Sequence, residues 1–137
     1  MEVTKITIQN HINADLTKVW EYYNNPYHIT KWNFAHPLWH CPSAINDIRI
    51  GGKFLARMEA KDGSFGFDFS ATYIEVVEYK KLAYLLDDNR LVEIYFSSDN
   101  GSTEVKIKFD AESQNSVEHQ KQGWQSILDN FKRYVEG

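Results

Sequence analysis

The chain has 137 residues, enough to enclose a single core, so we expect one domain over residues 1–137. Its 15 lysine and arginine residues are outnumbered by 19 aspartate and glutamate residues, and the charges are scattered, which argues against nucleic acid as a partner. No apolar run approaches the roughly 18 residues of a membrane span, no secretion-signal pattern opens the chain and Cys41 is the single cysteine, so we expect a cytoplasmic protein.

The N-terminal region predicts a strand followed by two short helices. Alternate isoleucines within residues 6–8 mark the strand, because alternation gives a strand one buried face. Asp15 is a suitable N-cap for a helix over residues 16–25. Asn25 followed by Pro26 predicts the start of a second helix, because proline at the first helical position loses no needed hydrogen-bond donor. We expect the two helices to form a hairpin.

The middle of the chain predicts an antiparallel meander. Turn-forming sequences recur near positions 51, 61, 78, 87 and 99. Between these turns apolar residues recur at every second position, and the segments are 54–58, 65–69, 92–96 and 103–109. Strands that are joined by short turns pair antiparallel. These four segments show the pattern most clearly, and with the first strand and the stretches between the remaining turns we expect one sheet of about seven strands.

The C-terminal region predicts a long helix. Residues 115–136 place apolar side chains at spacings of three and four, and this stripe consists of Trp124, Ile127, Leu128, Phe131 and Val135. The fold class is therefore α+β: a curved antiparallel sheet, two short helices after the first strand and a long C-terminal helix across the sheet. Twist makes such a sheet curl, and the space beneath the helix is either a cavity or filled by side chains. The sequence leaves both alternatives open.

Eleven side chains are candidates for the wall of a ligand-binding cavity. Seven are expected to point inward, and these are Phe54, Met58, Phe67, Phe69, Phe96, Trp124 and Leu128. Tyr84 and Tyr95, together with Tyr73, carry hydroxyl groups that could orient a ligand. Phe34 and Trp39 belong to the aromatic segment 26–40, which would form a lid if it folded over the open end of the sheet. Packing of an ordinary core would equally explain each of these residues.

Residues that could carry chemistry form no complete motif. His36, His40 and Cys41 are potential zinc donors, but no second donor pair follows at a suitable spacing, so no metal site and no cofactor are predicted. The segment IGGKF at 50–54 lacks the remaining residues of a phosphate-binding loop. Carboxylates such as Asp68 alternate with inward apolar residues and should therefore face solvent. No catalytic residue is assigned.

Three blocks of sequence resemble one known family. HINADLTKVWEYYNNPYHITKW at 11–32, DIRIGGKF at 47–54 and GWQSILDNFKRYVE at 123–136 occur in the order found in the START-like, or Bet v 1-like (SRPBCC), superfamily. They are most similar to its activator-of-Hsp90-ATPase homologue branch. The resemblance covers nearly the whole chain, and it implies a helix-grip fold in which the C-terminal helix lies over a cavity.

The resemblance also frames three hypotheses for function. The first is binding of a hydrophobic small molecule in the cavity between the sheet and the C-terminal helix, without covalent chemistry. The second is a cyclase-like or hydrolytic enzyme that uses the same cavity. The third is a cochaperone-type interaction domain, for which a chaperone partner is implied by family analogy only. Fold alone does not choose among them.

Overall fold

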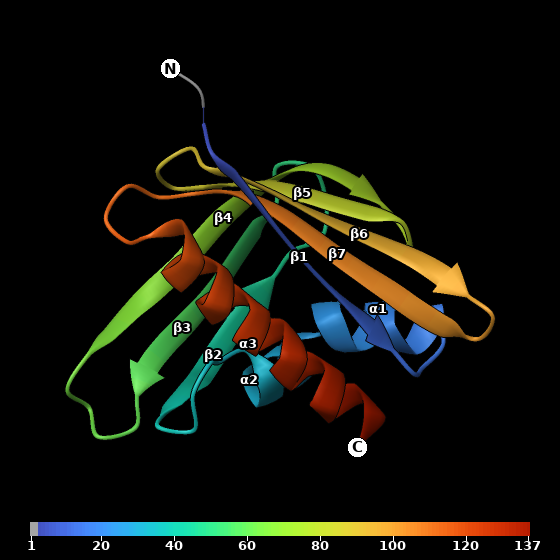
Figure 1. The fold of residues 1–137 in the computed structure, drawn as a ribbon, viewed down its shortest axis with the longest axis horizontal. Coiled ribbons are helices and arrows are strands. Elements are labelled where there is room, and N and C mark those ends of the chain that lie inside the picture. The colour runs from blue at the N-terminus through green and yellow to red at the C-terminus, as the bar shows by residue number, and fades with distance from the viewer. Residues whose placement is uncertain (1–2) are drawn as a thin grey trace.

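The computed structural model describes residues 3–137 as a seven-stranded sheet with three helices (Figure 1). In chain order the elements are β1 (Lys5–Ile12), α1 (Leu16–Asn24), α2 (Pro26–Trp32), β2 (Trp39–Asn46), β3 (Lys53–Ala60), β4 (Gly66–Val77), β5 (Lys81–Leu86), β6 (Leu91–Asp99), β7 (Ser102–Asp110) and α3 (Val117–Glu136). The predicted order of one strand, two short helices, six strands and one long helix is confirmed.

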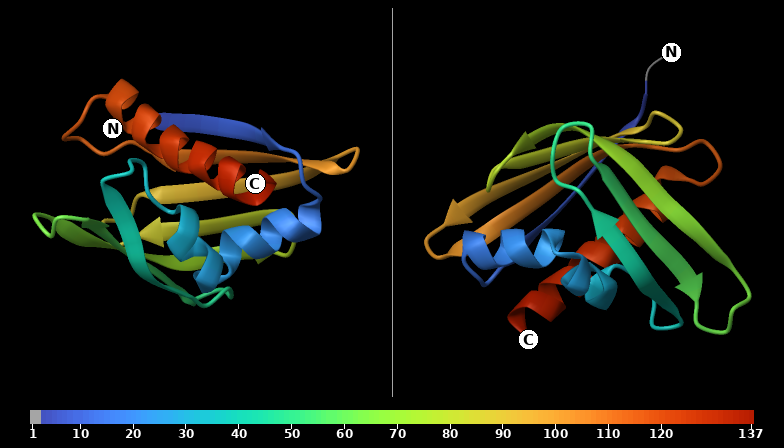
Figure 2. Two further views of the ribbon diagram at one scale, coloured as in Figure 1. Left: turned by 90° about the horizontal axis from the view of Figure 1, so that it is seen from below. Right: turned by 180° about the vertical axis from the view of Figure 1, so that it is seen from behind.

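All neighbouring strands pair antiparallel in the order β1-β7-β6-β5-β4-β3-β2. Strands β2 to β7 thus form the predicted meander, while β1 closes onto β7 and leaves β1 and β2 as the two edges. The sheet curls, and α3 runs across its concave face while α1 and α2 lie beside α3 on the same side (Figures 1 and 2). This is the predicted helix-grip arrangement.

Side-chain caps fix where the helices begin. The Asp15 carboxylate accepts a hydrogen bond from the backbone N–H of Lys18, 2.9 Å away, at the start of α1. Asn25 ends α1 and caps α2 through the N–H of Tyr27, also 2.9 Å away. The long helix begins at residue 117 because Ser116 caps it, slightly later than the apolar periodicity predicts.

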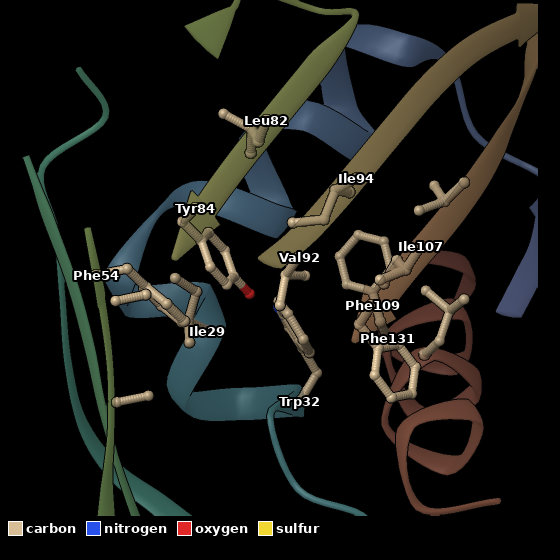
Figure 3. Close-up of a cluster of buried hydrophobic side chains, with 14 of the residues drawn as sticks. Ile29, Trp32, Phe54, Leu82, Tyr84, Val92, Ile94, Ile107, Phe109 and Phe131 are labelled. Atoms are coloured by element: carbon tan, nitrogen blue, oxygen red, sulfur yellow. The ribbon is translucent and has the colours of Figure 1, made fainter. Parts of the chain in front are cut away.

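The apolar stripe of α3 divides into two parts with different neighbours. Leu128, Phe131 and Val135 are buried in the hydrophobic core. Figure 3 shows Phe131 of this group beside the sheet residues that it packs with. Trp124 and Ile127 are only partly buried, because the space in front of them is not filled by the sheet. The C-terminal half of α3 therefore anchors the helix, and its N-terminal half spans a hollow.

Two expectations about aromatic segments are corrected. The expected lid after α2 contains a strand, β2, which pairs with β3 and has an irregularity between His40 and Ser43 at Pro42. Proline thus keeps this backbone extended, but at a sheet edge. Phe65 precedes β4 and is 61% exposed, so the strand that was expected at 65–69 begins at residue 66 and continues to residue 77.

Candidate functional site

A cavity of about 370 Å³ lies between the concave face of the sheet and the N-terminal half of α3. Strands β3, β4 and β5 form one wall of it, with Phe54, Met58, Phe67, Phe69 and Tyr84. These residues share one face of the sheet because strand alternation places every second side chain on the same side. The wall is thus mainly aromatic and its shape is set by the sheet.

Helix α3 forms the opposite wall, with Gly123, Trp124, Ile127 and Leu128. Gly123 leaves room in this wall, since a Cβ atom built there would meet no atom within 4 Å. Glycine in a helix interior costs about 1 kcal/mol relative to alanine. Gly123 therefore lowers helix stability at a position where no close approach of another backbone segment requires glycine.

The cavity is too large to be a packing defect. An empty apolar space of this volume would cost about 9 kcal/mol at ~24 cal/mol per Å³. That is comparable with the whole free energy of unfolding of a typical domain, about 5–15 kcal/mol. Water or a ligand that fills the space removes much of this cost.

Seven of the eleven predicted wall residues do line the cavity, and these are Phe54, Met58, Phe67, Phe69, Tyr84, Trp124 and Leu128. Their contact with a ligand stays a prediction. Tyr73 also lines the cavity, on the same face of β4 as Phe67 and Phe69.

The other four predicted residues lie elsewhere. Phe96 is buried under α1, where its ring meets Trp20 edge to face with centroids 5.0 Å apart. Tyr95 lies on the convex face, because its neighbours in β6 point inward, and its hydroxyl donates to Glu93 over 3.0 Å. Phe34 follows α2 outside the cavity wall.

Trp39 lies one layer outside the cavity. Its ring contacts those of Phe65 and Phe67, with centroids 5.9 Å and 6.1 Å away. Of these three aromatic residues, Phe67 alone lines the cavity. The predicted role of Trp39 at the rim therefore becomes a supporting contact to a wall residue.

A polar group of residues, of which the sequence singled out Tyr73 alone, closes the end of the cavity near α1. Tyr73 donates a hydrogen bond to the Oδ1 atom of Asn46 over 2.6 Å, and the Asn46 amide donates to the Asn24 carbonyl over 2.9 Å. Tyr23 of α1 adds a further hydroxyl group to this region. Burial raises the pKa of Tyr73 well above its usual value, so the hydroxyl stays protonated.

The opening of the cavity is polar, and the side chain of Gln120 fixes the backbone there through hydrogen bonds. Its side-chain oxygen accepts from the N–H of Glu112 over 2.8 Å, and its amide donates to the carbonyls of Glu112 and Asn115. Arg90 and His119 also lie at the opening. Asn115 and His119 line the cavity and are exposed, so the cavity meets solvent on this side.

A family model described as Activator of Hsp90 ATPase homolog 1-like protein matches residues 13–136. The chain belongs to this family. The match spans all three blocks on which the sequence resemblance rested, apart from the first residues of the opening block. No curated protein matches the chain.

Solved structures agree with the family assignment. An AHSA1-like protein from Aeromonas hydrophila is 44% identical, with a TM-score of 0.91 over 97% of this chain and 92% of that one. A protein from Cytophaga hutchinsonii is also 44% identical, with a TM-score of 0.84 over 96% and 92% of the two chains. A protein from Chromobacterium violaceum, 20% identical with a TM-score of 0.86 over 98% and 99%, shares the fold.

In this family member Asp68 faces solvent, as alternation predicts, and Glu93 likewise lies away from the apolar interior. Asp68 faces outward and pairs with Arg57 over 3.4 Å, and Glu93 pairs with Lys81 over 3.2 Å on the convex face. Within residues 3–137, Glu112 is the one carboxylate in the cavity wall, and it lies at the opening. The apolar part of the cavity thus offers hydroxyl and amide groups to a ligand.

The histidines and the cysteine of the aromatic segment serve local structure. His36 accepts a hydrogen bond from the N–H of Leu38 over 3.0 Å, and His40 lies 3.6 Å from Glu59. Cys41 is buried, and this burial raises the pKa of its thiol, which opposes thiolate formation. Across residues 3–137 no three metal-binding side chains come together, and no helix is long and apolar enough to cross a membrane.

Proposed function

We propose that this family member binds a hydrophobic small molecule in the cavity between the sheet and α3. The single observation that carries the proposal is a cavity of about 370 Å³ with a mainly aromatic wall and a polar opening. Ligand pockets have volumes from about 300 Å³ upward and combine apolar walls with a few polar groups. No covalent chemistry is needed for this function.

The glycine in α3 supports the same function. Gly123 widens the cavity at a cost in helix stability, and such a cost is reasonable if the space serves a guest molecule. The mainly aromatic wall offers flat faces and the thioether of Met58 adapts to irregular shapes, which suits an apolar or aromatic ligand.

The two alternative functions have less support from the geometry. An enzyme reaction that needs a buried acid or base would have to rely on Glu112 or His119 at the opening. A cochaperone role rests on the family name, and it would not require an internal cavity. Chaperone binding therefore remains a hypothesis from family membership alone.

The experiment that tests the proposal fills the cavity from α3. The wild-type protein is screened against a library of hydrophobic small molecules by thermal shift and by native mass spectrometry. Gly123→Leu places a side chain in the cavity and should abolish the binding of any hit. Gln122→Leu adds the same side chain at an exposed neighbouring position and should leave binding intact. The proposal fails if no compound stabilises the wild type, or if Gly123→Leu binds the hits as well as the wild type does.

A further inference from the structure

Tyr84 presents a hydroxyl group to the cavity without a hydrogen-bond partner. The residue is only 5% exposed, and its ring packs against Phe54 and Tyr73 with centroids 5.8 Å and 5.6 Å away. Figure 3 shows the hydroxyl pointing away from β5 into the space between Phe54 and Trp32. Within residues 3–137 no protein group accepts its proton, and the oxygen is not sealed off from the cavity.

Tyr23 presents a second such hydroxyl from α1. Its ring is held by Trp32, Phe96 and Phe131, with centroids 5.1 to 5.4 Å away. Its hydroxyl likewise has no partner among the described residues, although the residue lines the cavity. The rings of both tyrosines are thus fixed by packing, so their oxygens have fixed positions.

The two hydroxyls belong to one polar group. All three tyrosines line this cavity, and the ring of Tyr73 packs against that of Tyr84 with centroids 5.6 Å apart. Tyr23 directly precedes Asn24, which is joined to Tyr73 through hydrogen bonds of Asn46. Tyr73 already donates its proton to Asn46. Tyr84 and Tyr23 are therefore the two donors left free at this end of the cavity.

Free donors in an apolar cavity indicate what should lie opposite them. A buried hydroxyl without a partner is destabilising, and phenylalanine would pack the same ring without that cost. Water can accept these hydrogen bonds while the cavity has no ligand. A ligand that displaces this water keeps its affinity only if it replaces the hydrogen bonds.

We propose that Tyr84 and Tyr23 donate hydrogen bonds to a neutral acceptor oxygen, such as a ketone or ester carbonyl, on an otherwise apolar ligand. This inference rests on the proposed function and specifies the ligand class of the same cavity. A neutral oxygen fits better than a carboxylate, because the nearest cation in the wall, Arg90, lies at the opening and pairs with Asp88 over 2.8 Å. An unpaired anion in an apolar interior is strongly disfavoured.

The test compares benzophenone with diphenylmethane. The two probes share two phenyl rings and differ in that a carbonyl replaces a methylene group. Two hydrogen bonds to the carbonyl oxygen should make benzophenone bind the wild type about tenfold more tightly, as measured by calorimetry or fluorescence competition. Infrared spectroscopy should show the carbonyl stretch of bound benzophenone at lower frequency than in a hydrocarbon solvent.

The variants Tyr84→Phe and Tyr23→Phe remove one donor each without changing the ring. Each should lower the affinity for benzophenone about threefold and leave that for diphenylmethane within about twofold. Tyr95→Phe is the matched control, since its hydroxyl lies on the convex face with Glu93. It should leave both affinities unchanged.

The outcomes separate this inference from the proposed function. If both probes bind the wild type equally and the carbonyl stretch is unshifted, the tyrosine inference is overturned while ligand binding stands. If Tyr84→Phe and Tyr23→Phe keep the full preference for the ketone, the inference is also overturned. If neither probe nor any library compound binds, the proposed function fails and the inference fails with it.

Discussion

Trp124 of α3 stacks face to face on Phe109 of β7, with ring centroids 3.9 Å apart and ring planes 12° from parallel. This stack fixes the distance between the helix and the sheet at one side of the cavity. The other side of Trp124 meets Phe69 edge to face at 6.1 Å. One side chain therefore links the helix to the core and also forms part of the cavity wall.

Replacing Trp124 with alanine should destabilise the protein. The change removes the stack on Phe109 and enlarges the cavity, so the free energy of unfolding should fall by about 3 kcal/mol. This is the lower end of the range for Trp→Ala changes, because the ring of Trp124 is only partly buried. Urea unfolding followed by circular dichroism measures this loss of unfolding free energy. Gln122→Ala on the exposed face of α3 should change it by less than about 0.5 kcal/mol. Equal effects of the two variants would contradict the anchoring role of Trp124.

Gly123→Ala should stabilise the protein. An added Cβ meets no atom within 4 Å, so the gain in helix propensity of up to about 1 kcal/mol is not offset by a clash. The same urea titration measures the increase. A loss of stability would show that α3 approaches the sheet more closely than described here.

Gly52→Ala should have the opposite effect. A Cβ atom at Gly52 would overlap the backbone carbonyl oxygen of Asp47, and backbone cannot move aside as a flexible side chain can. We expect the free energy of unfolding to fall by at least about 2 kcal/mol. Comparison with Gly123→Ala controls for the chemistry of the substitution, because both add one methyl group. A neutral result at Gly52 would exclude the described close approach.

Asp110 should make stability depend on acid pH. Burial raises the pKa of this carboxyl, but the Lys5 ammonium and the N–H of Leu91 at 2.8 Å more than offset burial and hold the pKa below its usual value. The stability that Asp110 contributes is therefore complete above the unfolded-state pKa of about 3.9, and it is lost as the pH falls through the lower folded-state pKa.

The measurement is the free energy of unfolding of the wild type and of Asp110→Asn between about pH 2 and pH 6. The variant should be less stable near pH 6 and should lose less stability than the wild type on acidification. If both proteins show the same pH dependence, the Lys5–Asp110 pair does not contribute as described.

The sequence predicts the fold well because its elements depend on local patterns. Capping by Asp15 and Asn25 determines where α1 and α2 begin, and alternation identifies most strands. Strand β2 was missed as a strand because WHCPSAIN does not alternate clearly and contains Pro42. The aromatic content of this segment suggested a lid, but its position is determined by the pairing of β2 with β3.

The candidate site could be predicted only in part. Alternation and helical spacing identify side chains on a common face, which accounts for Phe54, Phe69 and Trp124. Whether such side chains fill the space depends on the distance between helix and sheet, which no local pattern encodes. The same alternation that points Phe96 inward places Tyr95 on the convex face, so alternation does not support Tyr95 as a wall residue. Tyr23 lies on α1, and its orientation depends on how α1 packs on the sheet.

Pro42 has a consequence for how copies of this chain behave at high concentration. The residue lies on β2, one of the two outer strands, where pairing with β3 is irregular and proline offers no amide N–H. A strand from a neighbouring molecule cannot form an uninterrupted ladder of hydrogen bonds along this margin. We therefore expect the irregular strand β2, although it exposes Ile45, to disfavour edge-to-edge pairing along this margin.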